Sequence, residues 1–178
     1  VNHARSLGLS IIHQELNMVP DLTVAQNLYI GRQGSHRFGW IDDAALNRQA
    51  SDLFDRLGMR IDPKARIGDL SVARQQMVEI ARALSYDSRI LVMDEPTAAL
   101  GVKESRRVLE LIRDVRARGI PIILISHNMP HVFEVADRIH IHRLGSRLCV
   151  IRPQDYSMSD AVAFMTGAKV PEAAEVAA

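Results

Sequence analysis

Three short, mainly apolar runs set the framework of this 178-residue chain. They are LSII at 9–12, RILVM at 89–93 and IPIILIS at 120–126. Each run has the length of a strand but is too continuous for a strand with one solvated face, so we expect helices to cover both faces of the sheet. Helical patterns separate the runs. This alternation predicts an α/β fold with a mainly parallel sheet.

Helical periodicity predicts the elements that join these runs. Between the second and third runs, apolar residues recur at helical spacing from Val108 to Val115, and Gly119 follows as a stop signal. This helix is the crossover that two parallel strands require. A further helix is expected over 42–57, with Asp42 as its N-cap.

The chain divides into three stretches and a tail. We expect 15–88 to be a mainly helical subdomain, which includes a helix that starts at Ser71. The stretch 89–152 is expected to hold the core strands, the crossover helix and, near its end, a β-hairpin. A C-terminal helix is expected over 153–168, and 169–178 lacks periodicity and is expected to be a loose tail.

Composition and charge exclude several classes of protein. Lys and Arg together number 22 against 21 Asp and Glu, spread evenly over the chain, so no part is a basic arm for nucleic acid. The apolar run at 120–125 is far shorter than the ~20 residues of a membrane-spanning helix. The single cysteine, Cys149, allows no internal disulfide and fits a reducing compartment.

Two adjacent carboxylates carry the clearest chemical signal. In ILVMDEPTAAL, Asp94 and Glu95 follow a buried strand, at the edge where open α/β sheets bind ligands. Neighbouring carboxylates repel each other, so a bound cation at one and a proton taken by the other explain the pair. Mg²⁺ prefers oxygen ligands and suits Asp94, while Glu95 is placed to activate a water molecule. The alternative is that Asp94 caps the next segment and Glu95 is merely solvated.

Three further polar residues stand at the ends of predicted elements. Ser71 occupies a helix N-cap position, where its hydroxyl and the first-turn amides can bind phosphate, although an ordinary capping serine is the alternative. Gln14 and His127 follow the first and third apolar runs, and such side chains can bind a metal's water or a phosphoryl oxygen. Each alone is more often a satisfied polar group. Together with the carboxylates they indicate one site.

In this order, the motifs resemble those of the nucleotide-binding subunits of ABC transporters. Gln14 matches the Q-loop of that family, residues 70–74 its signature motif, 90–95 its Walker B strand with the catalytic glutamate, and His127 its switch histidine. The resemblance implies a P-loop NTPase (RecA-like) core sheet with a helical subdomain, within a partial nucleotide-binding domain at 1–168.

The resemblance also implies a mechanism. Two cassettes sandwich two ATP molecules, and the cofactors are ATP and Mg²⁺. Glu95 activates the attacking water, Asp94 holds Mg²⁺ through water, His127 stabilises the γ-phosphate, and Gln14 senses Mg²⁺ and signals to the membrane permease. The signature residues of one cassette contact the ATP of the other: Leu70, Ser71, Val72, Ala73 and Arg74.

Longer segments resemble one group within the family. The stretch 11–31, QQMVEIARAL and DEPTAAL resemble monosaccharide importers of the ribose, xylose and fructose type, and 155–168 resembles their single-cassette members. The implied partners are a permease, a second identical or different cassette and, indirectly, a periplasmic or extracellular sugar-binding protein; no nucleic acid is implied. The implied location is peripheral, on the cytoplasmic face of the membrane. The sequence does not identify the sugar.

The sequence departs from the family in one major respect. No segment reads G-x-x-x-x-G-K-S/T, because the three lysines, Lys64, Lys103 and Lys169, follow Pro, Val and Ala. In the family this phosphate loop precedes the Q-loop, and only thirteen residues precede Gln14. We therefore expect the sequence to start within the domain and the chain alone to hydrolyse no ATP.

Smaller departures lie in two other motifs. Ala73 stands where the signature usually has Gly, and Arg74 replaces a neutral amide. Residues 98–101 resemble the D-loop of the family, but Gly101 ends this segment where Asp is usual. Two alternatives to the importer subunit stay open. One is a truncated cassette that binds partners without hydrolysis, and the other is a soluble cassette protein that acts on ribosomes or DNA.

Overall fold

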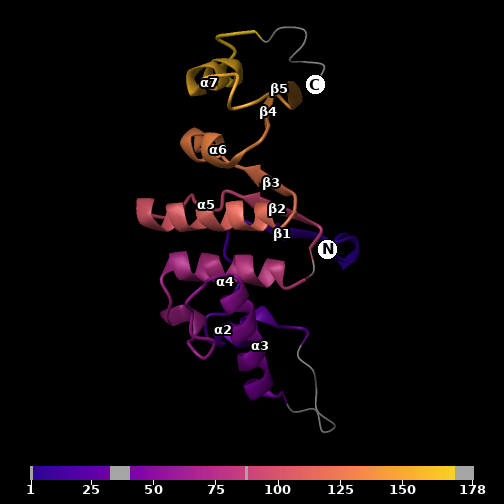
Figure 1. Ribbon diagram of the computed structural model, residues 1–178, viewed down its shortest axis with the longest axis vertical. Coiled ribbons are helices and arrows are strands. Elements are labelled where there is room, and N and C mark those ends of the chain that lie inside the picture. The colour runs from indigo at the N-terminus through magenta and orange to yellow at the C-terminus, as the bar shows by residue number, and fades with distance from the viewer. Residues whose placement is uncertain (1, 33–40, 87, 171–178) are drawn as a thin grey trace. The chain divides into compact units, whose positions relative to one another are not determined.

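The computed structural model describes residues 2–32, 41–86 and 88–170. Contacts group the chain into two compact units, 1–125 and 126–178, which are described separately (Figure 1). Most of the expected tail at 169–178 lies outside the described residues. Within the described part of the chain, no helix is long and apolar enough to cross a membrane.

The first unit contains a three-stranded parallel sheet. Its strands are adjacent in chain order: β1 (Leu9–Ile12), β2 (Ile90–Asp94) and β3 (Ile122–Ile125). The register places Ile12 beside Met93. The carboxyl ends of the strands therefore share one edge of the sheet. The predicted α/β fold with a parallel sheet is confirmed.

Helices connect the strands of this unit. α3 (Asp43–Arg56) and α4 (Val72–Leu84) precede β2, and α5 (Val102–Ala117) is the predicted crossover between β2 and β3. Asp42 caps α3, as predicted, by accepting a hydrogen bond of 2.9 Å from the backbone N–H of Ala45. The remaining helices are α1 (Asn2–Ser6), α2 (Val24–Leu28) and the 3₁₀ helix η1 (Ile67–Asp69).

The two faces of the sheet differ in burial. Leu91 and Met93 are fully buried on the face that α4 contacts, where the hydroxyls of Ser10 and Ser88 also lie 2.6 Å apart. The other face carries three isoleucines that are 50%, 53% and 51% exposed: Ile11, Ile123 and Ile125.

The expectation that helices cover both faces is therefore wrong for the described residues. The reason is the direction in which the chain crosses the sheet. It moves from β1 to β2 to β3 without reversing, and right-handed crossovers then place both connecting helices, α4 and α5, on the same face.

The second unit combines two helices with the predicted hairpin. Its elements are α6 (Met129–Val135), β4 (Ile139–Arg143), β5 (Ser146–Ile151) and α7 (Met158–Thr166). β4 and β5 pair antiparallel, which confirms the hairpin. The turn residues Leu144 and Gly145 have φ values of 49° and 79°, as a two-residue turn between twisted strands requires.

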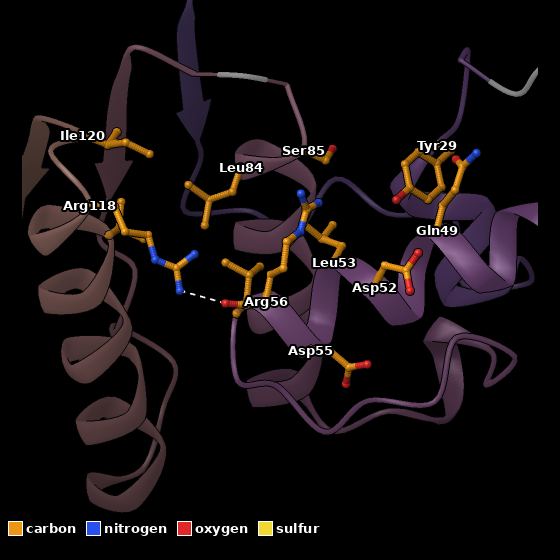
Figure 2. A pocket seen from close by; sticks show the side chains of 12 residues that line it. Tyr29, Gln49, Asp52, Leu53, Asp55, Arg56, Leu84, Ser85, Arg118 and Ile120 are labelled. Atoms are coloured by element: carbon orange, nitrogen blue, oxygen red, sulfur yellow. Dashed lines mark hydrogen bonds between the residues drawn. The ribbon is translucent and has the colours of Figure 1, made fainter.

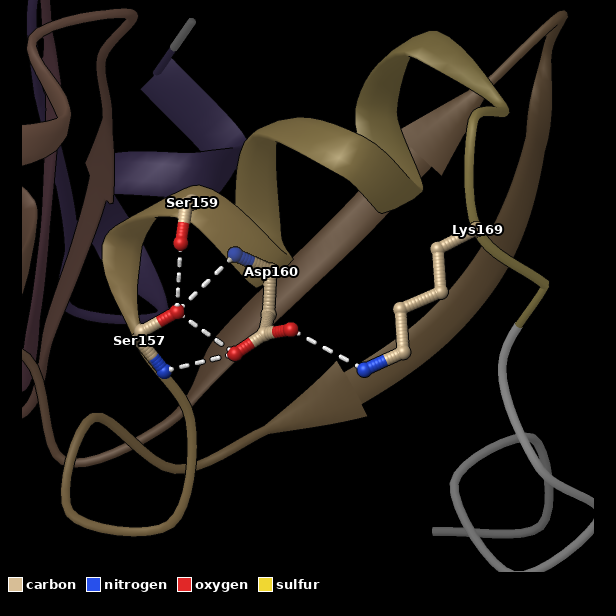
Figure 3. Close-up of polar contacts among 4 residues, drawn as sticks. All are labelled: Ser157, Ser159, Asp160 and Lys169. Atoms are coloured by element: carbon tan, nitrogen blue, oxygen red, sulfur yellow. Dashed lines mark hydrogen bonds and ion pairs between the residues drawn. The ribbon is translucent and has the colours of Figure 1, made fainter.

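Residues next to α7 stabilise both of its ends. At its start, Ser157 and Asp160 form a capping box (Figure 3). The Lys169 Nζ donates to the Asp160 carboxylate at 2.9 Å. Hydrogen bonds from Ser157, and then from Lys169, lower the pKa of Asp160 to about 2. At the other end, Gly167 adopts the left-handed conformation of a C-cap, with φ of 80°.

Candidate functional site

β2 delivers two carboxylates to the shared strand edge. Asp94 is the last residue of β2 and Glu95 the first beyond it, and both are half-buried. The φ of Glu95 is 46°, an uncommon conformation for a residue other than glycine, and its backbone N–H donates to the Ile125 carbonyl at 2.9 Å. Pro96 and Thr97, which follow, are buried. Backbone contacts therefore fix the position of Glu95.

Gln14 lies at the same edge of the sheet. β1 ends at Ile12, which pairs with Met93, so the loop after β1 leaves the sheet beside the residue that ends β2. The side chain of Gln14 is exposed. The fold thus brings Gln14 and Asp94, which are far apart in the sequence, to one edge.

The signature residues 70–74 form the start of α4. Ser71 occupies the N-cap position, as predicted, and is exposed, but its side chain makes no capping hydrogen bond. The hydroxyl of Ser71 therefore does not stabilise its own helix as a side-chain cap. A serine hydroxyl that does not cap its own helix remains a donor at the positive end of the helix dipole.

The side chain of Gln75 fixes the turn before α4. The Gln75 side-chain amide donates to the carbonyls of Ile67 and Leu70, both at 3.0 Å. On the solvent side of this turn, Val72 is 48% exposed and Arg74 is exposed. The signature is therefore a fixed turn with an open outer surface.

His127 belongs to the second unit, where it directly precedes Asn128. Asn128 caps α6 by accepting a hydrogen bond of 3.3 Å from the backbone N–H of His131. The carboxylates, Gln14 and the signature all belong to the first unit. These residues of the first unit form the candidate site.

The donor set at the strand edge suits one kind of cation. Among the described residues, no three His, Cys, Asp or Glu side chains gather as a metal cluster. Mg²⁺, however, is commonly bound through one or two carboxylates and keeps several waters. Asp94 and Gln14 offer a carboxylate and an amide oxygen at one edge, which fits this ion.

A pocket of about 710 Å³ lies elsewhere in the first unit (Figure 2). Its wall includes Ile120, which precedes β3. The pocket therefore lies toward the amino-terminal ends of the strands, whereas Asp94 lies at a carboxyl end. Arg118 donates to the Arg56 carbonyl at 2.8 Å across this wall. None of the predicted site residues lines the pocket.

The sequence predictions did not include two buried polar residues that contribute to the order of the loop after Gln14. They are Asn27 and Glu79. Asn27 is 1% exposed, and its amide donates to the carbonyls of Val19, Leu22 and Thr23, which orders the loop after Gln14. Its partners are backbone atoms, so no sequence pattern reveals them. Glu79 is 3% exposed, and its helical i,i+3 spacing to Arg82 was the available signal.

Comparisons with known proteins identify the family. The sequence model described as ABC transporter matches residues 2–98. The fructose import ATP-binding protein FrcA of Rhizobium meliloti is 54% identical over 98% of this chain and 70% of its own length. The ribose import ATP-binding protein RbsA 1 of Rubrobacter xylanophilus is 46% identical over 95% of this chain, which spans only 34% of that protein. The chain belongs to the ABC transporter family of ATP-binding proteins.

Solved structures show the same fold. A nucleotide-free ATP-binding cassette from an ABC transporter superposes with a TM-score of 0.75 at 21% identity, over 91% of this chain and 70% of that one. The ADP conformation of another ATP-binding cassette gives 0.73 at 22% identity, over 94% and 68%. The predicted P-loop NTPase fold class is confirmed.

Proposed function

We propose that this chain is the ATP-binding and ATP-hydrolysing part of a sugar importer. The observation that carries the proposal is the similarity to FrcA, 54% identity along 98% of the chain. The placement of Gln14, Asp94 and Glu95 at one sheet edge supports it, because phosphoryl transfer depends on positioned oxygen and proton-accepting groups.

Glu95 is the general base in this proposal. Its carboxylate accepts a proton from the water that attacks the γ-phosphate, a role that commonly contributes ~10²–10⁴-fold to a rate. The backbone bond to Ile125 and the buried residues that follow hold Glu95 in place. Such positioning lowers the entropy that the reaction must lose at the transition state.

Asp94 and Gln14 are the proposed residues for Mg²⁺, Asp94 through a water molecule. When bound with ATP, Mg²⁺ supplies neutralisation of the phosphate charge. His127 is the proposed donor to the γ-phosphate. Gln14 lies on an exposed loop, which suits its further role as the contact that reports to the permease.

The signature is proposed to act on the nucleotide of a second cassette. The Ser71 hydroxyl and the first amides of α4 form a donor set for phosphate at a helix N-terminus. Leu70, Val72 and Ala73 shape this turn, and Arg74 adds a positive charge to its outer surface. An open surface of this kind fits a ligand that another subunit carries.

The proposed partners follow from the import systems of the relatives. They are a membrane permease, a second cassette and, indirectly, a sugar-binding protein, with no nucleic acid among them. The proposed location is peripheral, on the cytoplasmic face of the membrane. The 178 residues alone are expected to hydrolyse no ATP, because they contain no phosphate loop.

Uptake into vesicles tests this function. The protein as its gene encodes it is reconstituted with its permease and binding protein, and uptake of radiolabelled fructose, ribose and galactose is measured with ATP inside. We expect ATP-dependent uptake of at least one of these sugars, and loss of uptake and of hydrolysis by ~10²–10³-fold in Glu95→Gln. The matched control is Glu110→Gln, an exposed glutamate on α5.

Two results separate the alternatives. A permease complex that forms but hydrolyses no ATP indicates the non-hydrolysing cassette. Hydrolysis that neither the permease nor any sugar changes indicates a cassette protein outside transport. Either result contradicts the proposed function.

A further inference from the structure

Glu79 is a buried acid that has no role in the proposed mechanism. It lies on α4, two turns after Ser71, and its side chain is only 4% exposed. Its Oε1 accepts a hydrogen bond from Arg82 at 3.0 Å, whereas Oε2 is buried without a hydrogen-bond partner among the described atoms. Burial of a carboxylate is costly unless it is fully paired. A half-satisfied acid in a helix therefore requires an explanation.

Arg82 connects this acid to the loop that follows Gln14. One nitrogen of its guanidinium binds Glu79, and the other donates to the backbone carbonyl of Asn17 at 2.8 Å. A guanidinium group is planar and holds two acceptors in a fixed geometry. The Glu79 carboxylate thus orients the group that grips the loop.

The environment of Glu79 places it at the junction between α4 and this loop. Burial raises the pKa of the Glu79 carboxyl, while Arg82, the Asn17 backbone and His13 oppose the rise. His13 and Asn17 lie on either side of Gln14 in the sequence. The groups around the acid therefore come from both α4 and the loop.

The same helix carries the signature at its other end. Ser71 precedes the first turn of α4, and Gln75 fixes that turn through the carbonyls of Ile67 and Leu70. An α-helix of 13 residues is a stiff element. A displacement that pulls on Asn17 is therefore transmitted through Arg82 to the whole of α4.

We propose that Glu79 is a positioning residue. By orienting Arg82, it fastens the loop after Gln14 to α4, so that a movement of this loop driven by the permease also moves the signature. The inference rests on the proposed function and names the contact through which its coupling runs. Glu79 itself touches neither nucleotide nor water in the reaction.

The test compares Glu79→Gln with Arg82→Lys in the protein as its gene encodes it. Gln keeps the shape of the side chain but removes the charge that orients Arg82, and Lys keeps the positive charge but lacks the planar group that holds two acceptors in a fixed geometry. The matched controls are Glu110→Gln and Arg107→Lys, both at exposed positions on α5. Two quantities are measured: amide hydrogen exchange of residues 14–20, and the ratio of ATP hydrolysis with the permease to hydrolysis without it.

We expect both variants to exchange faster in 14–20, with exchange in β2 unchanged, and to lose about 2- to 30-fold of the permease stimulation. The KM for ATP is expected to stay within about twofold, because the contact does not reach the nucleotide. A purely structural role predicts instead that exchange rises in β2 as well and that the ratio is unchanged.

Three outcomes overturn the inference. They are unchanged exchange in 14–20, faster exchange with unchanged stimulation, and equal losses in the control variants. Failure of the proposed function is seen separately, because the unmodified protein then shows no stimulation by the permease. That result also overturns the coupling role assigned to Glu79.

Discussion

The end of β2 and the start of α4 both carry proposed ATP-contacting residues, yet their surroundings differ. At the end of β2, Glu95 is half-buried, its backbone is bonded to Ile125, and buried residues follow it. At the start of α4, Ser71 is exposed and its hydroxyl does not cap the helix. The end of β2 is enclosed by residues of its own unit. The start of α4 is fixed only by the Gln75 side chain, and its outer surface is exposed.

This difference matches the roles that the proposed function gives to the two ends. A catalytic base needs a fixed position relative to a nucleotide held by its own cassette, and surrounding backbone provides this. A group that binds the ligand of a second subunit needs an accessible surface on a stiff support. The Gln75 contacts behind Ser71 provide the support without covering the surface.

The strained backbone at Glu95 gives the larger of two stability effects. Glu95→Ala and Glu95→Gly both remove the side chain, but only glycine adopts a φ of 46° without steric cost. We expect the glycine variant to be more stable than the alanine variant by about 1 kcal/mol. Urea denaturation followed by circular dichroism measures the difference. Equal stabilities, or a more stable alanine variant, contradict the enclosed and strained geometry of this end.

The opposite end is expected to respond much less. Ser71→Ala removes a hydroxyl that makes no capping bond, so the free energy of unfolding is expected to change by less than about 0.5 kcal/mol. The same urea titration measures it. Asp42→Ala is the matched control, because Asp42 does cap α3 and its loss is expected to cost ~1 kcal/mol. If Ser71→Ala lowers the free energy of unfolding as much as Asp42→Ala does, the Ser71 hydroxyl is a structural cap, and the claim that it is free to bind a ligand is contradicted.

The sequence predicted the elements with strong local patterns. The apolar runs, the periodicity from Val108 to Val115 and the Asp42 cap depend on neighbouring residues, and the structure has them in place. The shared edge of Gln14 and Asp94 was predictable because parallel strands align their carboxyl ends.

Other features depend on tertiary arrangement and were not predictable in this way. The exposed face with Ile11 and Ile123 follows from the order and handedness of the crossovers, which a strand's own residues do not encode. The hydrogen bond from Arg82 to Asn17 uses a backbone carbonyl, which every residue has. The choice of Asn17 as the partner therefore arises only from the fold.

A mixing experiment on the protein as its gene encodes it tests most directly whether the two ends act on different nucleotides. Glu95→Gln damages the site of its own cassette, and Ser71→Glu repels the phosphate held by the other cassette. When the two inactive variants are mixed, half of the sites in a mixed dimer of this protein are intact. We expect ATP hydrolysis to recover to roughly a quarter of the normal rate after random pairing into two-fold dimers. Recovery must be absent when both changes are on one chain that is mixed with the unmodified protein and only mixed dimers are isolated. If mixing the two variants restores no hydrolysis, the ends do not act on separate nucleotides, and the central claim is contradicted.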